Sequence, residues 1–320
     1  MENTLKKSVS RPITVGREGL LLITLIILCI VFASQSEFFL SSRNLTTVLR
    51  NSVDLSVICA GMTIIIILGG IDVSVGGILA VSAVMIGRAY QYGMPDIIVI
   101  PIGLLTGAAL GYGNGLLIAK TRVPPIVATL GSMYIFTATL FIVIGGVWIS
   151  GLPNSLSFLV LGSFAGIPSG VFVIAVVYGG SWTILRRTPW GQRVVAIGCD
   201  EKSAQLAGIS VVRTKIQAYA LLGLFAGVAA LLYVARLRNV EVNIGTNIAL
   251  EAIAATILGG ANIRGGVGSL LGALLGVIFI KITQNGLVLI GVSSLWETVV
   301  IGGLLIAVLA IDAFETRRTS

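Results

Sequence analysis

A carboxylate and a hydroxyl group lie two residues apart, at Asp72 and Ser74, inside a glycine-rich island between long apolar runs. Side chains of these types can exchange hydrogen bonds with a polar solute, or they can satisfy backbone groups where a helix is interrupted. Gly69, Gly70 and Gly76 frame the island, and glycine lets a helix break and lets neighbouring helices approach closely. Polar groups in hydrocarbon are tolerated only where protein or water surrounds them. The island therefore predicts a membrane protein whose helices part around a polar pathway.

The roles of the polar side chains within the apolar runs stay open. Asp72 can line the pathway or cap the helix that starts after it, and the capping role is favoured because a permanent carboxylate would hold a solute too tightly. Glu251 is the other acid in an apolar run, where a pathway role and an interhelical hydrogen bond are equally reasonable. Asn114 and Asn285 suit transient contacts with hydroxyl groups, although such residues more often join one helix to another.

Composition places the chain among membrane proteins. Of its 320 residues, 56% are hydrophobic and 11% are charged, whereas soluble domains carry about 25% charged residues. The chain has no histidine, which excludes histidine proton relays and histidine-ligated metals. Cys29, Cys59 and Cys199 are scattered and form neither a disulfide framework nor a metal cluster, so no cofactor is expected. The net charge of +8 comes from short basic blocks between apolar runs, a pattern that orients membrane helices rather than one that binds nucleic acid.

Apolar runs of about 20 residues predict the membrane-spanning helices. The first run, 19–33, is short enough to resemble a signal peptide, but an uncleaved helix is favoured because the rest of the chain is equally apolar. The expectation is an all-α membrane protein, a bundle of about ten helices in a single transmembrane domain over 1–320. The segments 71–90 and 247–262 are weak on length, and one of them is a candidate re-entrant helix. The predicted ranges are 19–33, 46–69, 71–90, 96–118, 124–146, 169–186, 212–237, 247–262, 264–288 and 294–312.

Charge in the connections predicts the orientation. With the N-terminus in the cytoplasm, the basic connections 119–123 and 186–215 also fall there, and the uncharged segment 147–168 falls outside. An even helix count places the C-terminus in the cytoplasm as well. Asp54 is expected to be exposed at the outer end of its helix, and Glu297 is expected to begin the last one. The exceptions to the rule, on or near the outer side, are Arg43, Arg50, Arg236 and Arg238.

An internal echo favours the transporter interpretation. The residues Ile67-Leu68-Gly69-Gly70 recur as Ile257-Leu258-Gly259-Gly260, and each copy leads into a glycine-rich break and a new apolar run. Matching interrupted helices in two halves of a chain indicate a transport site at the interface of a repeat. The alternative is chance, because glycine and isoleucine are abundant here.

The largest cytoplasmic connection, 186–212, contains a second signal. Asp200 is a good N-cap, Glu201 suits the first turn of a helix, and Gly208 is a natural stop. The helix between them has about two turns, with mildly apolar residues at Ala204 and Leu206, and is too short to be stable alone. It is therefore expected to dock, either on its own bundle or on a cytoplasmic partner.

The chain resembles a known family. The segment Gly70–Gly76 is similar to the G-I-D-[LV]-S-V-G signature of ribose-type permeases of bacterial ABC sugar importers. The resemblance extends in order over nearly the whole chain. It includes 60–63, 127–131, 191–208, 251–260, 265–269 and 285–287. Asp200, where asparagine is commoner, and the polar turn 262–264 depart from the family pattern.

The resemblance implies a type II importer fold and a set of partners. Family members dimerise, bind two cytoplasmic ABC ATPase domains, and receive a monosaccharide from a periplasmic or lipid-anchored binding protein at the bacterial inner membrane. The chain is not the ATPase, since it contains no G-x-x-x-x-G-K-[ST] phosphate-binding loop. The sequence contains no Ser/His, HExxH or paired-carboxylate motif, so we do not expect an enzyme. The sugar, and the choice between a homodimer and a heterodimer, stay open.

Two groups of candidate site residues follow. Those expected at the pathway or the helix breaks are Gly69, Gly70, Asp72, Ser74, Gly76, Asn114, Glu251, Gly259, Gly260 and Asn285. Those that the resemblance implies for coupling to the ATPase are Gly191, Arg193, Gly198, Asp200, Glu201, Ala204, Leu206 and Gly208. The alternative function is an ion-coupled secondary transporter of a small polar solute, which would need an ion or proton site. Replacing Gly198 by glutamate, or deleting 200–208, is expected to abolish transport only if an ATPase docks there.

Overall fold

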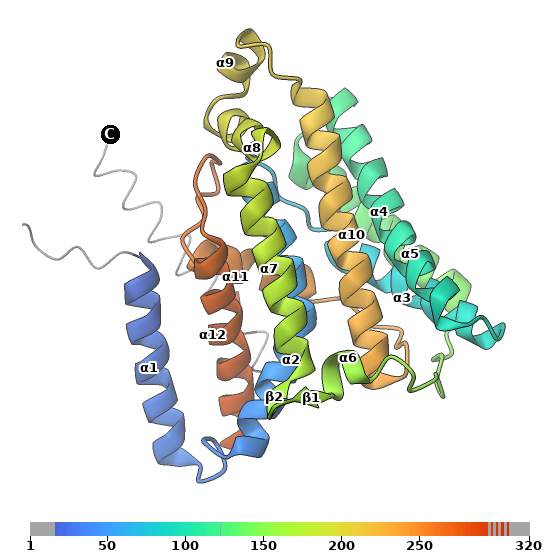
Figure 1. The fold of residues 1–320 in the computed structure, drawn as a ribbon, viewed down its shortest axis with the longest axis vertical. Coiled ribbons are helices and arrows are strands. Elements are labelled where there is room, and N and C mark those ends of the chain that lie inside the picture. Colours follow the sequence, from blue (N-terminus) through green and yellow to red (C-terminus); the bar gives the residue numbers. More distant parts are fainter. Residues whose placement is uncertain are drawn as a thin grey trace, which may run out of the picture.

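A computed structural model describes residues 17–121 and 123–293, together with the isolated positions 296, 299, 302, 303 and 306. The described part is predominantly helical, as expected from the sequence (Figure 1). The elements are α1 (Arg17–Gln35), α2 (Ser42–Ile67), α3 (Val75–Gln91), α4 (Asp96–Thr121), α5 (Pro125–Ile144), α6 (Phe158–Leu161), β1 (Ser163–Phe164), β2 (Ile167–Pro168), α7 (Ser169–Arg187), α8 (Pro189–Cys199), α9 (Glu201–Leu206), α10 (Val211–Leu237), α11 (Ile248–Leu258) and α12 (Leu270–Leu289).

The length of the helices decides which of them can cross a membrane. Within the described residues, seven helices are long and apolar enough, namely α1, α2, α4, α5, α7, α10 and α12. α3 has 17 residues and α11 has 11, so both of the segments that looked weak in the sequence are short. The chain is thus a multi-pass helical membrane protein. The count of ten stays a prediction, because the tenth segment, 294–312, lies mostly outside the described residues.

The core of the bundle is α2. Its side chains are buried almost continuously from Ser52 to Ile67, and it contacts α7, α10, α11 and α12. A helix that is apolar all round and surrounded by other helices needs no polar face. α2 is therefore the element against which the others are positioned.

α10 packs against α4 at very short range. A Cβ atom added at Gly107 would overlap the carbonyl oxygen of Gly223, and the reciprocal holds for Gly223 and the carbonyl of Gly107. Small residues at a membrane helix crossing let the two backbones touch and gain van der Waals contact. This crossing fixes α4, which carries Asn114, against α10.

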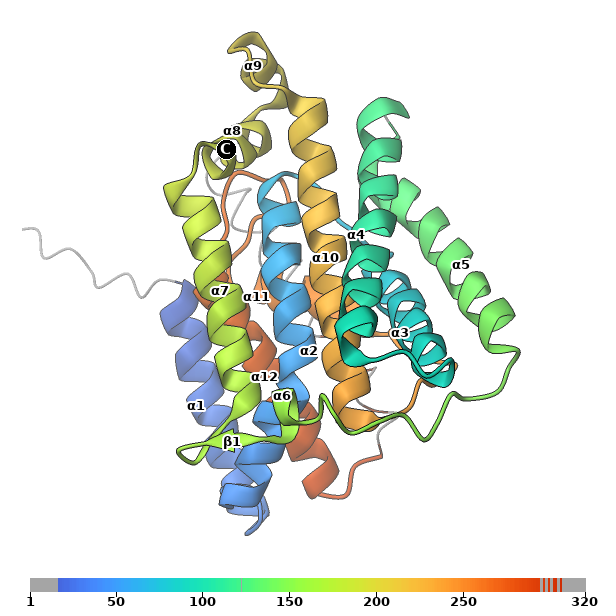
Figure 2. The ribbon, with the colours of Figure 1, turned by 45° about the vertical axis from the view of Figure 1, so that its right-hand side comes forward.

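The two ends of the bundle differ in the segments they carry. α8 and α9 lie at the same end as the connection between α4 and α5, and the N-terminal end of α1 points toward that side (Figures 1 and 2). The opposite end carries the connection between α1 and α2 and the segment before α7. That segment contains α6 and a small antiparallel hairpin in which Ser163 pairs with Pro168, which an all-helical expectation missed. The basic connections expected to share one side, 119–123 and 186–215, do lie at one end.

Candidate translocation and coupling site

The break after α2 is a helix end closed by backbone hydrogen bonds. Gly69 has φ +85°, and the N–H of Gly70 donates to the carbonyl of Ile65 at 2.9 Å. α11 ends in the same way, with Gly260 at φ +94° and the N–H of Ala261 donating to Thr256 at 3.2 Å. Both ends are Schellman motifs, in which a left-handed residue follows the last turn. The structural match is shifted by one residue from the echo read in the sequence, so a full internal repeat stays a prediction.

Asp72 is completely buried beneath this break. Its Oδ1 accepts the backbone N–H of Ser74 at 2.8 Å and the Ser74 hydroxyl at 2.6 Å. Asn114 on α4 donates to the same hydroxyl at 2.7 Å. Within the described residues, the second carboxylate oxygen and the nearby Tyr219 hydroxyl have no hydrogen-bond partner. The carboxylate is thus placed to hold the start of α3 and, through one hydroxyl, to join the break to α4.

Gly76 and Gly259 are packing positions in this arrangement. A Cβ at Gly76 would overlap the carbonyl oxygen of Gly245, which belongs to the segment between α10 and α11. A Cβ at Gly259 would overlap the backbone of Gly272 on α12. Both glycines let one backbone touch another, which is a packing role. Gly76 also borders a separate cavity of about 210 Å³.

Glu251 lies on α11 and bonds across to α12. Its carboxylate accepts from the ammonium group of Lys281 at 2.8 Å and from the amide of Gln284 at 3.0 Å. Lys281 also donates to Gln284 at 2.9 Å. The sequence left two roles open for Glu251, a pathway role and an interhelical hydrogen bond. The structure shows the hydrogen bond between helices. Lys281 was not singled out from the sequence, although a basic residue well inside the apolar run 264–288 was a visible signal.

The expectation of an exposed Asp54 is wrong. Asp54 is only 7% exposed, because its carboxylate pairs with Arg236 of α10 at 2.7 Å. Arg236 also donates to Asn51 at 2.6 Å. A carboxylate buried within a helical bundle needs such a partner. The sequence could not reveal it, because the two residues are 182 positions apart.

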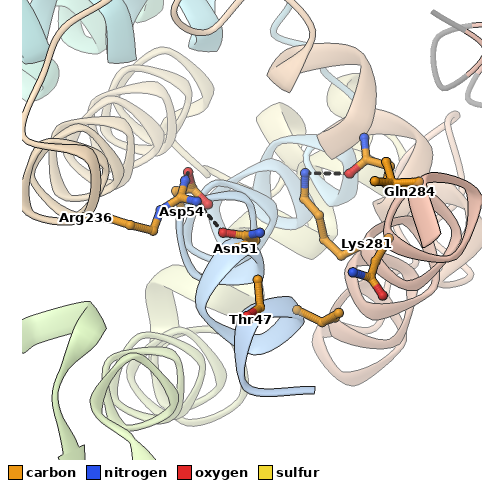
Figure 3. Close-up of a pocket in the computed structure, with 9 residues that line it drawn as sticks. Thr47, Asn51, Asp54, Arg236, Lys281 and Gln284 are labelled. Carbon is orange, nitrogen blue, oxygen red and sulfur yellow. Dashed lines mark hydrogen bonds and ion pairs between the residues drawn. The ribbon is translucent and has the colours of Figure 1, made fainter. Parts of the chain in front are cut away.

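Three members of the two ion pairs, Asp54, Arg236 and Lys281, border one cavity of about 460 Å³. Figure 3 shows Asn51, Asp54 and Arg236 gathered on one side of it, with Lys281 and Gln284 on the other. Asn285 also borders the cavity and exchanges two hydrogen bonds with Asn44, at 2.8 and 2.9 Å. The candidate pathway residues therefore form two groups. One is at the α2–α3 break (Gly69, Gly70, Asp72, Ser74, Gly76, Asn114), and the other is on α11 and α12 (Glu251, Gly259, Gly260, Asn285).

The connection between α7 and α10 forms two helices rather than one. Thr188 caps α8 by accepting from the N–H of Gly191 at 3.2 Å, and Pro189 occupies its first position. Asp200 caps α9 as expected, accepting from the N–H of Lys202 at 2.9 Å and from the hydroxyl of Ser203 at 2.7 Å. These bonds favour the charged carboxylate and hold the pKa of Asp200 below its usual value. Gly208, at φ +81°, ends the segment.

The residues implied for coupling face different ways. Gly191 and Ala204 are buried against the chain itself, whereas Arg193 is exposed on α8. Glu201 pairs with Lys215 of α10 at 2.7 Å. Leu206 is 89% exposed at the end of α9. Only part of the implied surface is therefore free to meet another protein.

Gly198 connects α8 to both helix breaks. It is buried, and a Cβ there would overlap the carbonyl oxygen of Ile67 and lie 2.7 Å from the backbone nitrogen of Gly266. The N–H of Gly266 itself donates to Ile67 at 2.8 Å. Replacing Gly198 by glutamate would therefore disrupt the junction directly, so that substitution cannot serve as a test of docking. A test of docking is better made at Leu206, whose side chain is exposed.

A bundle of long apolar helices that encloses two helix breaks and paired charges is the architecture of a multi-pass membrane permease. A family profile described as branched-chain amino acid transport system / permease component matches residues 44–309, and the chain belongs to this family. No solved structure matches the chain.

Relatives in three bacteria have names that state what each imports. The ribose import permease of Bacillus subtilis is 37% identical over 290 residues, which is 90% of each chain. The autoinducer 2 import system permease of Klebsiella pneumoniae is 34% identical over 298 residues, 93% of this chain and 86% of that one. The fructose import permease of Rhizobium meliloti is 34% identical over 283 residues, 86% of this chain and 79% of that one.

Proposed function

We propose that this chain is the membrane-spanning subunit of an ATP-driven importer for a monosaccharide or a similar polyhydroxylated solute. The similarity to import permeases for ribose, autoinducer 2 and fructose supports the solute class. The sequence identities to these three permeases are too similar to one another to select one of the three compounds as the solute. The family description names branched-chain amino acids instead, so leucine uptake is the comparison that any transport assay should include.

The proposal that a partner ATPase drives transport rests on one observation, the exposed Leu206 on α9. A short helix capped by Asp200 and tied to α10 through Glu201 holds this leucine in the solvent at 89% exposure. A single exposed leucine is ordinary on a protein surface. Here it lies on a helix too short to be stable without support, in the connection where the family resemblance implies an ATPase contact. We assign Leu206 as the anchor for that ATPase.

The junction at Gly198 supplies a route for movement. α8 ends against Ile67, at the end of α2, and against Gly265 and Gly266, which follow the break after α11. When ATP closes the partner ATPase, a displacement of α9 and α8 would press on both breaks at once. The solute would then leave toward the cytoplasm, and the chain itself forms no covalent bond with it.

The rest of the assembly follows from the same proposal. The chain lies in the bacterial inner membrane with both termini in the cytoplasm, as the distribution of basic residues favours. A second permease subunit and a sugar-binding protein complete the importer. The ion-coupled alternative lacks support among the relatives. In the described residues, Asp54 and Glu251 are each paired with a cation and are not free to take an ion. Asp72 has no such cation and is bonded to Ser74 instead, so the relatives carry the argument against ion coupling.

The test is co-purification of the ATPase with Leu206→Asp. The substitution is expected to abolish ATPase association and leave thermal stability unchanged, because the side chain is almost entirely in solvent. Val147→Asp is the matched control, since Val147 is 72% exposed and lies in the segment at the opposite end of the bundle. An ATPase that stays bound to Leu206→Asp would refute the anchor. A wild-type chain purified without any ATPase would refute the proposed function.

A further inference from the structure

The cavity between α2, α10 and α12 has an unusual lining for a membrane protein. Seven of its nine lining residues are polar or charged, and two are valines, Val48 and Val288. It lies at the end of the bundle opposite α8 and α9, since it is bordered by the first turns of α2 and the last turns of α10 and α12. A concentration of polar groups within membrane helices is costly unless water or a polar solute occupies the space.

Each charge that borders the cavity is paired, although Glu251, the partner of Lys281, does not itself line the cavity. Arg236 is bonded to Asp54, and Lys281 to Glu251, at 2.7 and 2.8 Å. An anion would have to compete with a carboxylate already in place at each cation, and a cation would meet the opposite obstacle. The cavity is therefore unsuited to an ion, and a neutral ligand fits its electrostatics.

Some hydrogen-bonding capacity is left over after the internal pairing. The Asn51 side-chain oxygen accepts from Arg236, but among the described residues its amide nitrogen has no partner. Lys281 uses two of its three N–H donors, on Glu251 and Gln284. The Thr47 hydroxyl donates to the carbonyl of Arg43 and still has lone pairs that can accept. Donors and acceptors thus face one space, which is what a ligand with several hydroxyl groups requires.

We infer that this cavity is a receiving subsite for the neutral, polyhydroxylated solute on the outer side of the permease. The inference rests on the proposed function, which places α9 in the cytoplasm and so puts the cavity at the side where a binding protein would release its solute. Binding through a few unspent donors and acceptors, with every charge already satisfied, is weak enough to let the solute move on. Asn51, Thr47 and Lys281 make the contacts, and Asp54, Glu251 and Gln284 position them.

The experiment uses the whole importer, with its ATPase and binding protein, in proteoliposomes supplied with labelled D-ribose or D-fructose. Val288 lines the cavity, so Val288→Trp should fill part of its space and reduce uptake at least about tenfold, a barrier of about 1.4 kcal/mol. Val176→Trp is the matched control, because Val176 is 75% exposed on α7 and away from the cavity. A milder pair is Thr47→Val and Thr183→Val, since each hydroxyl donates to the carbonyl four residues earlier and only Thr47 borders the cavity. Thr47→Val should slow uptake by about three- to tenfold, what one hydrogen bond is worth, and Thr183→Val should not.

A second readout measures occupancy directly. Val288→Cys, in a background lacking Cys29 and Cys199, should react with a polar thiol reagent more slowly when the sugar-loaded binding protein is present than when the empty one is. Equal labelling rates together with wild-type uptake by Val288→Trp would overturn the inference and leave the proposed function intact. If Val288→Cys reacts more slowly only when the protein is in vesicles of anionic phospholipid, whether or not sugar is present, the cavity binds a lipid headgroup. That result would also overturn the inference. Failure of the wild-type importer to take up any sugar would instead count against the proposed function.

Discussion

The Cα atom of Gly198, in the last turn of α8, lies against the carbonyl oxygen of Ile67, the last residue of α2, with no space for a Cβ atom between them. The same oxygen accepts the N–H of Gly266 at 2.8 Å, so three segments that are distant in the chain meet at one carbonyl group. A short helix of the connection between α7 and α10 is thereby in direct backbone contact with the buried helix that positions the rest of the bundle. Side-chain rotamers, which could absorb a displacement, are absent from this contact.

Replacing Gly198 by alanine should destabilise the protein and separate α8 from the breaks. Overpacking of this kind costs about 1–3 kcal/mol, and more where the obstacle is backbone. The measurement is thermal unfolding of the purified chain in detergent. Gly179→Ala is the matched control, because Gly179 lies on α7 and a Cβ there meets nothing within 4 Å. Equal stability of the two variants would contradict the tight junction.

The Asp72 carboxylate should act through its hydrogen bonds rather than through its charge. Asp72→Asn keeps an oxygen that can accept the N–H and hydroxyl of Ser74, so near-wild-type stability and uptake are expected. Asp72→Ala leaves a buried N–H and a hydroxyl without that acceptor, at a cost of about 1–3 kcal/mol. Comparison of both variants by thermal unfolding and sugar uptake decides the question. Loss of uptake in the asparagine variant with unchanged stability would transfer Asp72 to the pathway role.

Removing one partner of the ion pair between Asp54 and Arg236 should destabilise the protein strongly, whereas replacing both partners by apolar residues should not. Its side chains are 9% and 15% exposed. Arg236→Met leaves an unpaired buried carboxylate and should cost about 3–5 kcal/mol. The double variant Asp54→Leu/Arg236→Met should recover most of that stability, because hydrophobic replacement of a buried pair is often neutral. Denaturation of the single and double variants in detergent measures the coupling, and purely additive losses would show that the pair acts independently.

Sequence reasoning located the long helices well, because a run of apolar residues as long as the bilayer is thick is a direct physical signal. The expected range 212–237 corresponds to Val211–Leu237, and 96–118 to Asp96–Thr121. The range 264–288 begins six residues too early, because Gly265 and Gly266 adopt positive φ in the break and the helix starts at Leu270. α8 was not predicted, although Thr188 is a good N-cap and proline is favoured at the first position of a helix.

The site was predictable only where its contacts are local. Asp200 and its capped helix could be read from neighbouring residues. The partners of Asp54 and Glu251 could not, because they lie 182 and 30 residues away and depend on how the helices pack. The same holds for Gly198, whose neighbours Ile67 and Gly266 flank it from both halves of the chain. Spacing along one helix identifies a cap or a break, whereas an ion pair between helices requires the tertiary structure.

The N-cap of α9 should make the order of this helix depend on pH. Asp200 is fully exposed, and its pKa is lowered first by the hydroxyl of Ser203 and then by the N–H groups at the start of the helix. A group whose folded-state pKa is depressed contributes stability above the ordinary aspartate value of about 3.9, and that contribution disappears as the pH falls through the lower folded-state value. Protonated Asp200 is a weaker acceptor, so the first turn of α9 should fray in acid.

Hydrogen exchange of the α9 amides, corrected for the intrinsic effect of pH, measures this fraying. Protection should fall between neutral and acidic pH in the wild type and should vary less in Asp200→Asn, because asparagine caps a helix and does not titrate. Glu201, which is paired with Lys215, is a second acid on the same helix, so Glu201→Gln is needed as a control for its contribution. If Asp200→Asn loses protection over the same pH range as the wild type while Glu201→Gln does not, the pH dependence belongs to the ion pair and not to the cap.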